Sequence, residues 1–117
     1  MNGIVRIPFL SICIPTFNRA EHVFSLVKNI LCCYSDEIEV VVLDNCSTDE
    51  TKDLLCSIED DRFIFVQNPE NIGGLSNIIK VFTFANGVYA LLCLDRDYIE
   101  SQYILPLIDA LRKDNNV

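Results

Sequence analysis

Four short apolar runs alternate along the chain with stretches in which apolar residues recur every three or four positions. The runs are rich in Val, Ile, Leu and Phe and predict strands at residues 9–14, 38–43, 62–67 and 88–94. The run IEVVVL at 38–43 is typical of a strand that is buried on both faces. The run at 88–94 is the most apolar of the four, and we expect it at the centre of a sheet.

The stretches between the runs have the spacing of amphipathic helices. The first helix should end near Cys33, and Ser47 with Glu50 forms a capping box ahead of the second. Residues 103–111 predict a last helix, whose regular part begins near Pro106 because proline is tolerated in a first turn. The apolar stripes are Val23, Leu26, Val27, Ile30 and Leu31; Leu54, Leu55 and Ile58; and Leu75, Ile78, Ile79 and Phe82.

Strands and helices that alternate with short connections predict βαβ units. We therefore expect one α/β domain over residues 1–117, a three-layer αβα, Rossmann-like arrangement around a mainly parallel sheet. Ligands of such sheets bind beyond the carboxyl ends of the strands. Polar clusters follow three predicted strands, at 16–19, 44–47 and 95–97, so we expect one site where these clusters meet.

Composition narrows the kind of ligand. A formal net charge of −8 argues against binding to nucleic acid, which requires clustered Lys and Arg. An acidic chain that holds a phosphate needs a metal ion or backbone N–H groups. The six cysteines form no CxxC pair, and no signal peptide is evident, which is typical of a reducing, cytoplasmic chain. No apolar run is long enough to cross a bilayer, and peripheral contact with the inner face of the cell membrane stays open.

Two of the clusters contain groups suited to a metal and a nucleotide. Asp95 and Asp97 can both face a divalent cation if the backbone turns there, and Mg²⁺ or Mn²⁺ completes its shell with water and substrate phosphates. A bare DxD is also compatible with a solvated turn. Asp44, Asn45 and Ser47 can hydrogen-bond a nucleobase or ribose beside a helix N-terminus, or merely cap that helix.

Four blocks of the sequence together resemble a known family. They are LSICIPTFNRAEHV at 10–23, IEVVVLDNCSTDET at 38–51, NPENIGG at 68–74 and GVYALLCLDRD at 87–97. In this order and spacing they resemble family 2 glycosyltransferases with the GT-A fold. The similarity is greatest to the bacterial enzymes that build O-antigen, capsule and related surface polysaccharides, and it covers nearly the whole chain.

The resemblance implies transfer of a sugar from a nucleotide diphospho-sugar donor to a hydroxyl of a saccharide or lipid-linked acceptor, usually with inversion. A carboxylate acts as general base in such enzymes. Asp95 and Asp97 match the motif that holds Mn²⁺ or Mg²⁺ against the donor diphosphate. The residues that match donor-binding positions are Pro15, Thr16, Phe17, Asn18, Asp44, Asn45 and Asp95.

Three positions depart from the family pattern. Asn45 stands where the family commonly has a second Asp. Ser76 precedes Asn77 at a place where relatives often have Arg. Arg96 stands where they often have a third carboxylate, so it either occupies a metal-ligand position or pairs with phosphate in place of the missing Arg.

Family members are considerably longer than this chain, so we expect it to be the truncated, N-terminal donor-binding part of a transferase. The general base should then lie beyond residue 117, and an apolar patch should be uncovered or buried in a homodimer. A catalytically incomplete donor-binding fragment is the main alternative. A sugar-nucleotide nucleotidyltransferase normally holds triphosphate with a Gly-rich loop after its first strand, and PTFNRAE, which follows the first predicted strand here, contains no glycine. This function is therefore disfavoured. A flavodoxin-like module without catalysis is a further alternative.

Overall fold

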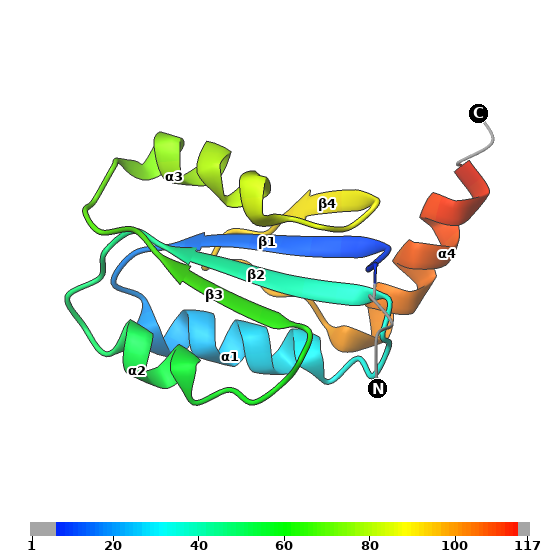
Figure 1. Cartoon of the computed structure of the whole chain (residues 1–117). Coiled ribbons are helices and arrows are strands. Elements are labelled where there is room, and N and C mark those ends of the chain that lie inside the picture. The colour runs from blue at the N-terminus through cyan, green and yellow to red at the C-terminus, as the bar shows by residue number, and fades with distance from the viewer. Residues whose placement is uncertain (1–6, 115–117) are drawn as a thin grey trace, which may run out of the picture.

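The computed structural model describes residues 7–114, and its centre is a four-stranded parallel sheet (Figure 1). The strands lie in the order β3-β2-β1-β4, and every neighbouring pair is parallel. Their bounds are Leu10–Thr16 for β1, Ile38–Asp44 for β2, Phe63–Gln67 for β3 and Tyr89–Leu92 for β4. Each predicted strand is therefore present, within three residues of its predicted ends.

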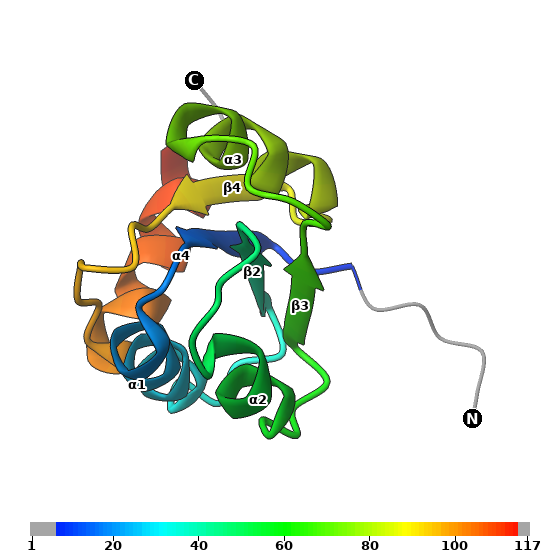
Figure 2. The same ribbon diagram turned by 90° about the vertical axis from the view of Figure 1, so that its left-hand side faces the viewer.

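Helices cover both faces of this sheet. Figure 2 shows α3 on one side and α1 and α2 on the other, which gives the predicted three-layer arrangement. The α-helices are α1 at Ala20–Leu31, α2 at Thr51–Cys56, α3 at Gly74–Val81 and α4 at Ile104–Asp114. Two short 3-10 turns, η1 at Phe82–Phe84 and η2 at Ser101–Tyr103, precede β4 and α4. Pro106 lies in the first turn of α4, as predicted.

The strands β1 and β2 form the core because both of their faces are covered. Every residue of the two strands is buried. Ile12 and Ile14 point to the larger apolar cluster with α1, while Cys13 joins the smaller cluster on the α3 side. This alternation explains why the run at 38–43 is apolar without a break: each face of β2 meets a helix layer.

The prediction that residues 88–94 lie at the sheet centre is wrong. Within residues 7–114, β4 pairs only with β1, so it is an edge strand of the described sheet, and Leu92 is 39% exposed. The interior positions belong to β1, between β2 and β4, and to β2, between β3 and β1. A run of apolar residues therefore did not distinguish a central strand from an edge strand whose outer residues are uncovered.

The predicted apolar stripe of α3 is also not the side that packs. Asn77 and Val81 are the buried residues of this helix, whereas Leu75 and Ile79 are 73% and 63% exposed. The amide of Asn77 donates to the carbonyl of Leu43, which turns the polar residue toward the sheet. Leu75 and Ile79 are thus apolar side chains of α3 that the described structure leaves exposed.

The capping box at the second helix is absent. The N-cap of α2 is Glu50, and no side chain caps it. Ser47 instead donates its hydroxyl to Asp44, because residues 45–50 fold toward β1 before the helix begins. At the end of α1, Cys33 is buried, whereas Cys32 is exposed. Among the helices that the structure describes, none has the length and apolar character to cross a membrane.

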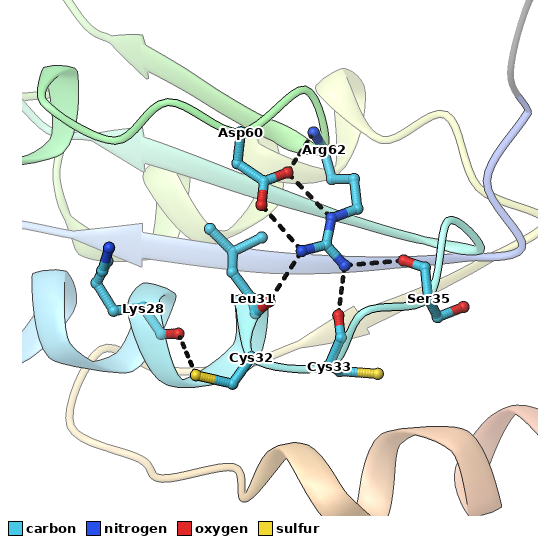
Figure 3. A network of polar contacts seen from close by, with 7 residues as sticks. All are labelled: Lys28, Leu31, Cys32, Cys33, Ser35, Asp60 and Arg62. Carbon is cyan, nitrogen blue, oxygen red and sulfur yellow. Dashed lines mark hydrogen bonds and ion pairs between the residues drawn. The ribbon is translucent and has the colours of Figure 1, made fainter.

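Arg62 fixes the end of the sheet that lies away from the strands' carboxyl ends (Figure 3). Its guanidinium donates to the carbonyl oxygens of Leu31, Cys33 and Ser35, and it pairs with Asp60 at 2.9 Å. These carbonyls lie at and just after the C-terminus of α1, where helical carbonyls lack partners of their own. Arg62 therefore ties α1 to β3 through hydrogen bonds on a side chain that is only 10% exposed.

Candidate functional site

The three predicted polar clusters meet at the carboxyl edge of the sheet. Thr16 and Asp44 are register partners at the ends of β1 and β2, and the Asn45 N–H donates to the Thr16 carbonyl at 2.9 Å. Asp95, which follows β4, accepts the Thr16 hydroxyl at 2.9 Å. The chain adds β2 and β3 on one side of β1 and β4 on the other, so the site lies at the topological switch point, where open α/β sheets bind ligands.

Asp95 and Asp97 lie on a tight turn directly after β4. The Asp97 N–H donates to the Leu94 carbonyl at 2.9 Å, and the Leu94 N–H donates back to the Asp97 carboxylate at 3.2 Å. The Asp95 carboxylate is 14% exposed and lies 3.6 Å from the Arg19 guanidinium. Asp95 and Asp97 therefore lie on one hydrogen-bonded turn, and the Asp97 carboxylate helps to close that turn.

Asn18 connects the loop after β1 to the loop after β2. Its side-chain oxygen accepts the N–H groups of Thr48 at 2.8 Å and Asp49 at 3.3 Å, and its own N–H donates to Ser47 at 2.8 Å. Asn18 has a φ of 51°, a left-handed conformation that asparagine adopts more easily than most residues. The Asn18 amide oxygen thus binds the loop after β2 and holds it against the loop after β1.

Asp49 ties the same loop to the start of α1. Its carboxylate accepts the Ala20 N–H at 3.2 Å and the Thr51 N–H at 3.0 Å. Burial works to raise the pKa of Asp49, but the hydrogen bonds from Thr51 and Ala20 outweigh it and lower that pKa. The ionised carboxylate suits this place, because the first N–H groups of a helix favour negative charge.

Asp44 is fully buried, and its carboxylate is directed into the protein. It accepts the Ser47 N–H at 3.0 Å, the Ser47 hydroxyl and the Gln67 amide at 2.8 Å. Both oxygens of Asp44 therefore already have partners from the chain. The residue positions the loop after β2, and the sequence pattern alone did not reveal this.

Asn45 is likewise enclosed, with 3% of its surface exposed. Its Nδ2 donates to Asn71 Oδ1 at 3.0 Å and to the Gly73 carbonyl at 3.3 Å. Its Oδ1 accepts Asn68 Nδ2 at 3.1 Å and the Ile72 N–H at 2.9 Å. Two donors and two acceptors exhaust the capacity of an amide, so Asn45 holds residues 68–73 against the end of β2.

Three further residues extend this network, and sequence reasoning missed their roles. Asn68 donates to Asn77 Oδ1 at 2.8 Å, and Lys80 donates to Asn68 Oδ1 at 2.9 Å. Asn68 and Asn77 are 2% and 3% exposed. Asn77 is a polar residue beside the apolar stripe of its helix, which was the available signal, but its partner Asn68 lies nine residues away across a loop and could not be deduced from spacing.

Two cavities adjoin this edge, and Asp95 borders both. One has a volume of about 230 Å³ and contains five of the predicted site residues. The other, of about 360 Å³, lies on the α1 side of the turn and includes Arg96 and Asp97. The first is lined by Pro15, Thr16, Phe17, Arg19, Asn45, Gly74, Asn77, Ile78, Leu94 and Asp95. Asp44, Asn18 and Asp97 do not line it, and neither does Arg96.

The carboxylates suit a hard cation that brings part of its own coordination. Across residues 7–114 no group of three or more His, Cys, Asp or Glu side chains could hold a metal ion. Mg²⁺ and Mn²⁺ need only one or two protein carboxylates when water and phosphate supply the rest, and Asp95 and Asp97 both border the cavity on the α1 side of the turn. Burial, followed by the charges of Asp97 and Asp95, raises the pKa of the nearby Cys93 thiol to about 11, so this thiol is neutral at pH 7.

Residues 11–117 match the sequence model of the family described as "Glycosyl transferase family 2". The chain belongs to glycosyltransferase family 2. It is 30% identical over 111 residues to the abequosyltransferase RfbV of Salmonella typhimurium, across 91% of this chain and 30% of that protein. It is 32% identical over 92 residues to the putative teichuronic acid biosynthesis glycosyltransferase TuaG of Bacillus subtilis, across 77% of this chain and 36% of that protein.

Solved structures show that this family 2 chain has the GT-A fold. TarS of S. aureus, residues 1–349 in complex with UDP, matches 90% of the chain and 32% of its own length, with a TM-score of 0.81 and 24% identity. The mannosyltransferase PcManGT of Pyrobaculum calidifontis, in complex with GDP-Man and Mn²⁺, covers the same shares with a TM-score of 0.75 and 23% identity. The chain spans about a third of the length of the relatives that it matches.

Proposed function

We propose that this chain binds the nucleotide diphospho-sugar donor of a family 2 glycosyltransferase at the carboxyl edge of its sheet. The observation that carries the proposal is the hydrogen bond between Thr16 and Asp95, which brings the loop after β1 and the DxD turn together beside one cavity. The relatives named above support the reaction class, transfer of a sugar to an acceptor hydroxyl in surface polysaccharide biosynthesis. The chemistry is transfer from the donor diphosphate, with inversion at the anomeric carbon.

The residues of the cavity divide into those that contact the donor and those that hold them in place. Phe17 is 42% exposed, so its ring is available to the base, and Pro15 and Thr16 supply the adjoining backbone. The polar atoms of Asp44 and Asn45 already have partners within the chain. These two residues therefore contribute to binding of the nucleobase indirectly, by holding the loops that border it. Nucleotide preference then depends on the shape of the loop over 68–74.

Asp95 and Asp97 would hold Mn²⁺ or Mg²⁺ against the diphosphate. The ion supplies positive charge where the leaving diphosphate develops negative charge. The structure of PcManGT with GDP-Man and Mn²⁺ supports this assignment by analogy of fold. Arg19, which lies beside Asp95 in the same cavity, supplies the positive charge of the chain itself at this place.

We place the general base outside residues 1–117. At the site, Asp44 is buried in hydrogen bonds and Asp95 is held by Thr16 and Arg19, so neither is available to take an acceptor proton. We further propose that the acceptor is a saccharide or a lipid-linked molecule and that the protein acts in the cytoplasm. For a lipid-linked acceptor, it would act at the inner face of the cell membrane.

Thermal unfolding with added nucleotide tests this function. We expect UDP, dTDP, GDP or CDP to raise the melting temperature in the presence of Mn²⁺, with one nucleotide giving the largest shift. Asp97→Ala should abolish the metal-dependent part, whereas Asp61→Ala, which removes a carboxylate at the opposite end of the sheet, should not. If no nucleotide stabilises the protein at millimolar concentration, the donor-site proposal is wrong. Binding without any transfer or donor hydrolysis would identify the chain as a donor-binding fragment.

A further inference from the structure

Asp95 already has two partners from its own chain. One carboxylate oxygen accepts the Thr16 hydroxyl at 2.9 Å, and the other lies 3.6 Å from Nε of Arg19. A divalent cation at Asp95 would therefore meet a guanidinium on the same carboxylate. Two cations cannot share one carboxylate oxygen at close range without strong repulsion.

Arg19 is placed to leave this position. Its side chain is 46% exposed, whereas that of Asp95 is 14% exposed, so Arg19 is the movable member of the pair. Its backbone carbonyl accepts the Val23 N–H at 3.0 Å, which anchors the residue at the start of α1 while the side chain stays free to turn. Among the described residues that line the cavity of about 230 Å³, Arg19 is the one cation and Asp95 the one anion.

Arg96, the cation that the sequence singled out, lies elsewhere. It is exposed and lines the cavity on the α1 side of the turn, together with His22 and Asp97. No ion pair of Arg96 occurs within residues 7–114. It therefore offers a matched arginine, adjacent to the same carboxylates in sequence but without the contact that Arg19 makes.

We propose that Arg19 is an internal counter-ion of Asp95 that the divalent metal displaces, and that the displaced guanidinium then binds the donor's diphosphate. The inference rests on the proposed metal site at Asp95. Arg19 is thus a positioning residue with two opposite effects: it weakens binding of the metal alone and strengthens binding of diphosphate once the metal is present. A guanidinium that pairs with phosphate oxygens makes strong, charge-assisted hydrogen bonds.

Titrations with Mn²⁺ alone test whether Arg19 weakens binding of the metal. The electron paramagnetic resonance signal of free Mn²⁺ measures how much of the ion is bound. Loss of an exposed ion pair should tighten Mn²⁺ binding by about two- to fivefold in Arg19→Ala and Arg19→Gln. Arg96→Ala also removes one positive charge, but Arg96 makes no ion pair within residues 7–114. This substitution should change the Mn²⁺ dissociation constant by less than about twofold, because salt screens the charge of an unpaired surface arginine. Urea midpoints near that of the wild type verify that the variants are folded.

Calorimetric titration with inorganic pyrophosphate at saturating Mn²⁺ tests the second effect without involving the base. We expect Arg19→Ala to bind pyrophosphate about tenfold more weakly than the wild type, and Arg96→Ala to bind it nearly as well. Equal Mn²⁺ and pyrophosphate dissociation constants in Arg19→Ala and the wild type would overturn the inference and leave the metal site intact. Absence of Mn²⁺ binding in the wild type and in every variant would overturn the metal site and the inference together.

Discussion

Replacing Asn45 by Ala removes the four hydrogen bonds that hold the loop over residues 68–73 against the end of β2. The amide donates to Asn71 and Gly73, and it accepts from Asn68 and the Ile72 N–H. All of these contacts join the end of β2 to residues 68–73. The substitution therefore measures directly how strongly the chain itself holds this loop in place.

The expected cost follows from what each partner retains. Asn71 Oδ1 still accepts the Gly73 N–H, and Asn68 still donates to Asn77. The Ile72 N–H loses its one partner among the described residues. Four hydrogen bonds at ~1 kcal/mol each set an upper bound of about 4 kcal/mol, and the retained contacts reduce the expected loss in unfolding free energy to about 2–3 kcal/mol.

Urea unfolding followed by circular dichroism measures this loss. For a slope of about 1–1.5 kcal/mol per molar urea, the midpoint should fall by about 2 M. Gln102→Ala is the matched control, because it removes a surface amide with one hydrogen bond to Glu100 and should change stability by less than about 0.5 kcal/mol. If Asn45→Ala unfolds at the same urea concentration as the control, the network does not hold the loop, and the reasoning is refuted.

Three further predictions concern other parts of the chain. Arg62→Met removes a guanidinium shared by three carbonyls and a carboxylate, and urea unfolding should show a loss of about 3 kcal/mol; an unchanged midpoint would contradict this. Cys46 has a φ of 66°, so Cys46→Gly should raise the unfolding free energy by about 0.5–1 kcal/mol, and any loss would count against strain there. Burial raises the pKa of Cys13 and Cys93 to about 11, which keeps both thiols neutral at pH 8. Iodoacetamide should then modify the exposed Cys32 but neither buried thiol, which peptide mass spectrometry would measure. Equal rates of modification at Cys32, Cys13 and Cys93 would refute the burial of the last two.

The sequence was sufficient for the architecture because strand and helix periods report burial locally. The runs at 38–43 and 62–67 became β2 and β3 with little change at their ends. The position of a strand in the sheet is a different matter, since it depends on which neighbours pair with it. β4 is apolar yet lies at the edge, with Leu92 39% exposed, and nothing within the run itself distinguishes the two positions.

The candidate site shows the same division. Convergence of Thr16, Asp44 and Asp95 followed from the rule that parallel strands end at one edge of the sheet. The partners of each side chain did not follow, because hydrogen bonds such as that between Asn45 and Asn68 join residues far apart in sequence. For the same reason the sequence drew attention to Arg96, as a residue at a metal-ligand position or a partner of phosphate, but gave no sign that Arg19 is the arginine beside Asp95.

Paramagnetic broadening by Mn²⁺ in the presence of UDP or GDP tests the central claim most directly. The isotope-labelled protein contains a second acidic surface, around Asp60 and Asp61 at the opposite end of the sheet, which serves as an internal comparison. At substoichiometric Mn²⁺, we predict that the amide signals of Phe17 and Asp95 broaden first and that those near Asp61 persist. Broadening confined to the surface around Asp60 and Asp61, with Phe17 and Asp95 unaffected, would contradict a donor site at the carboxyl edge.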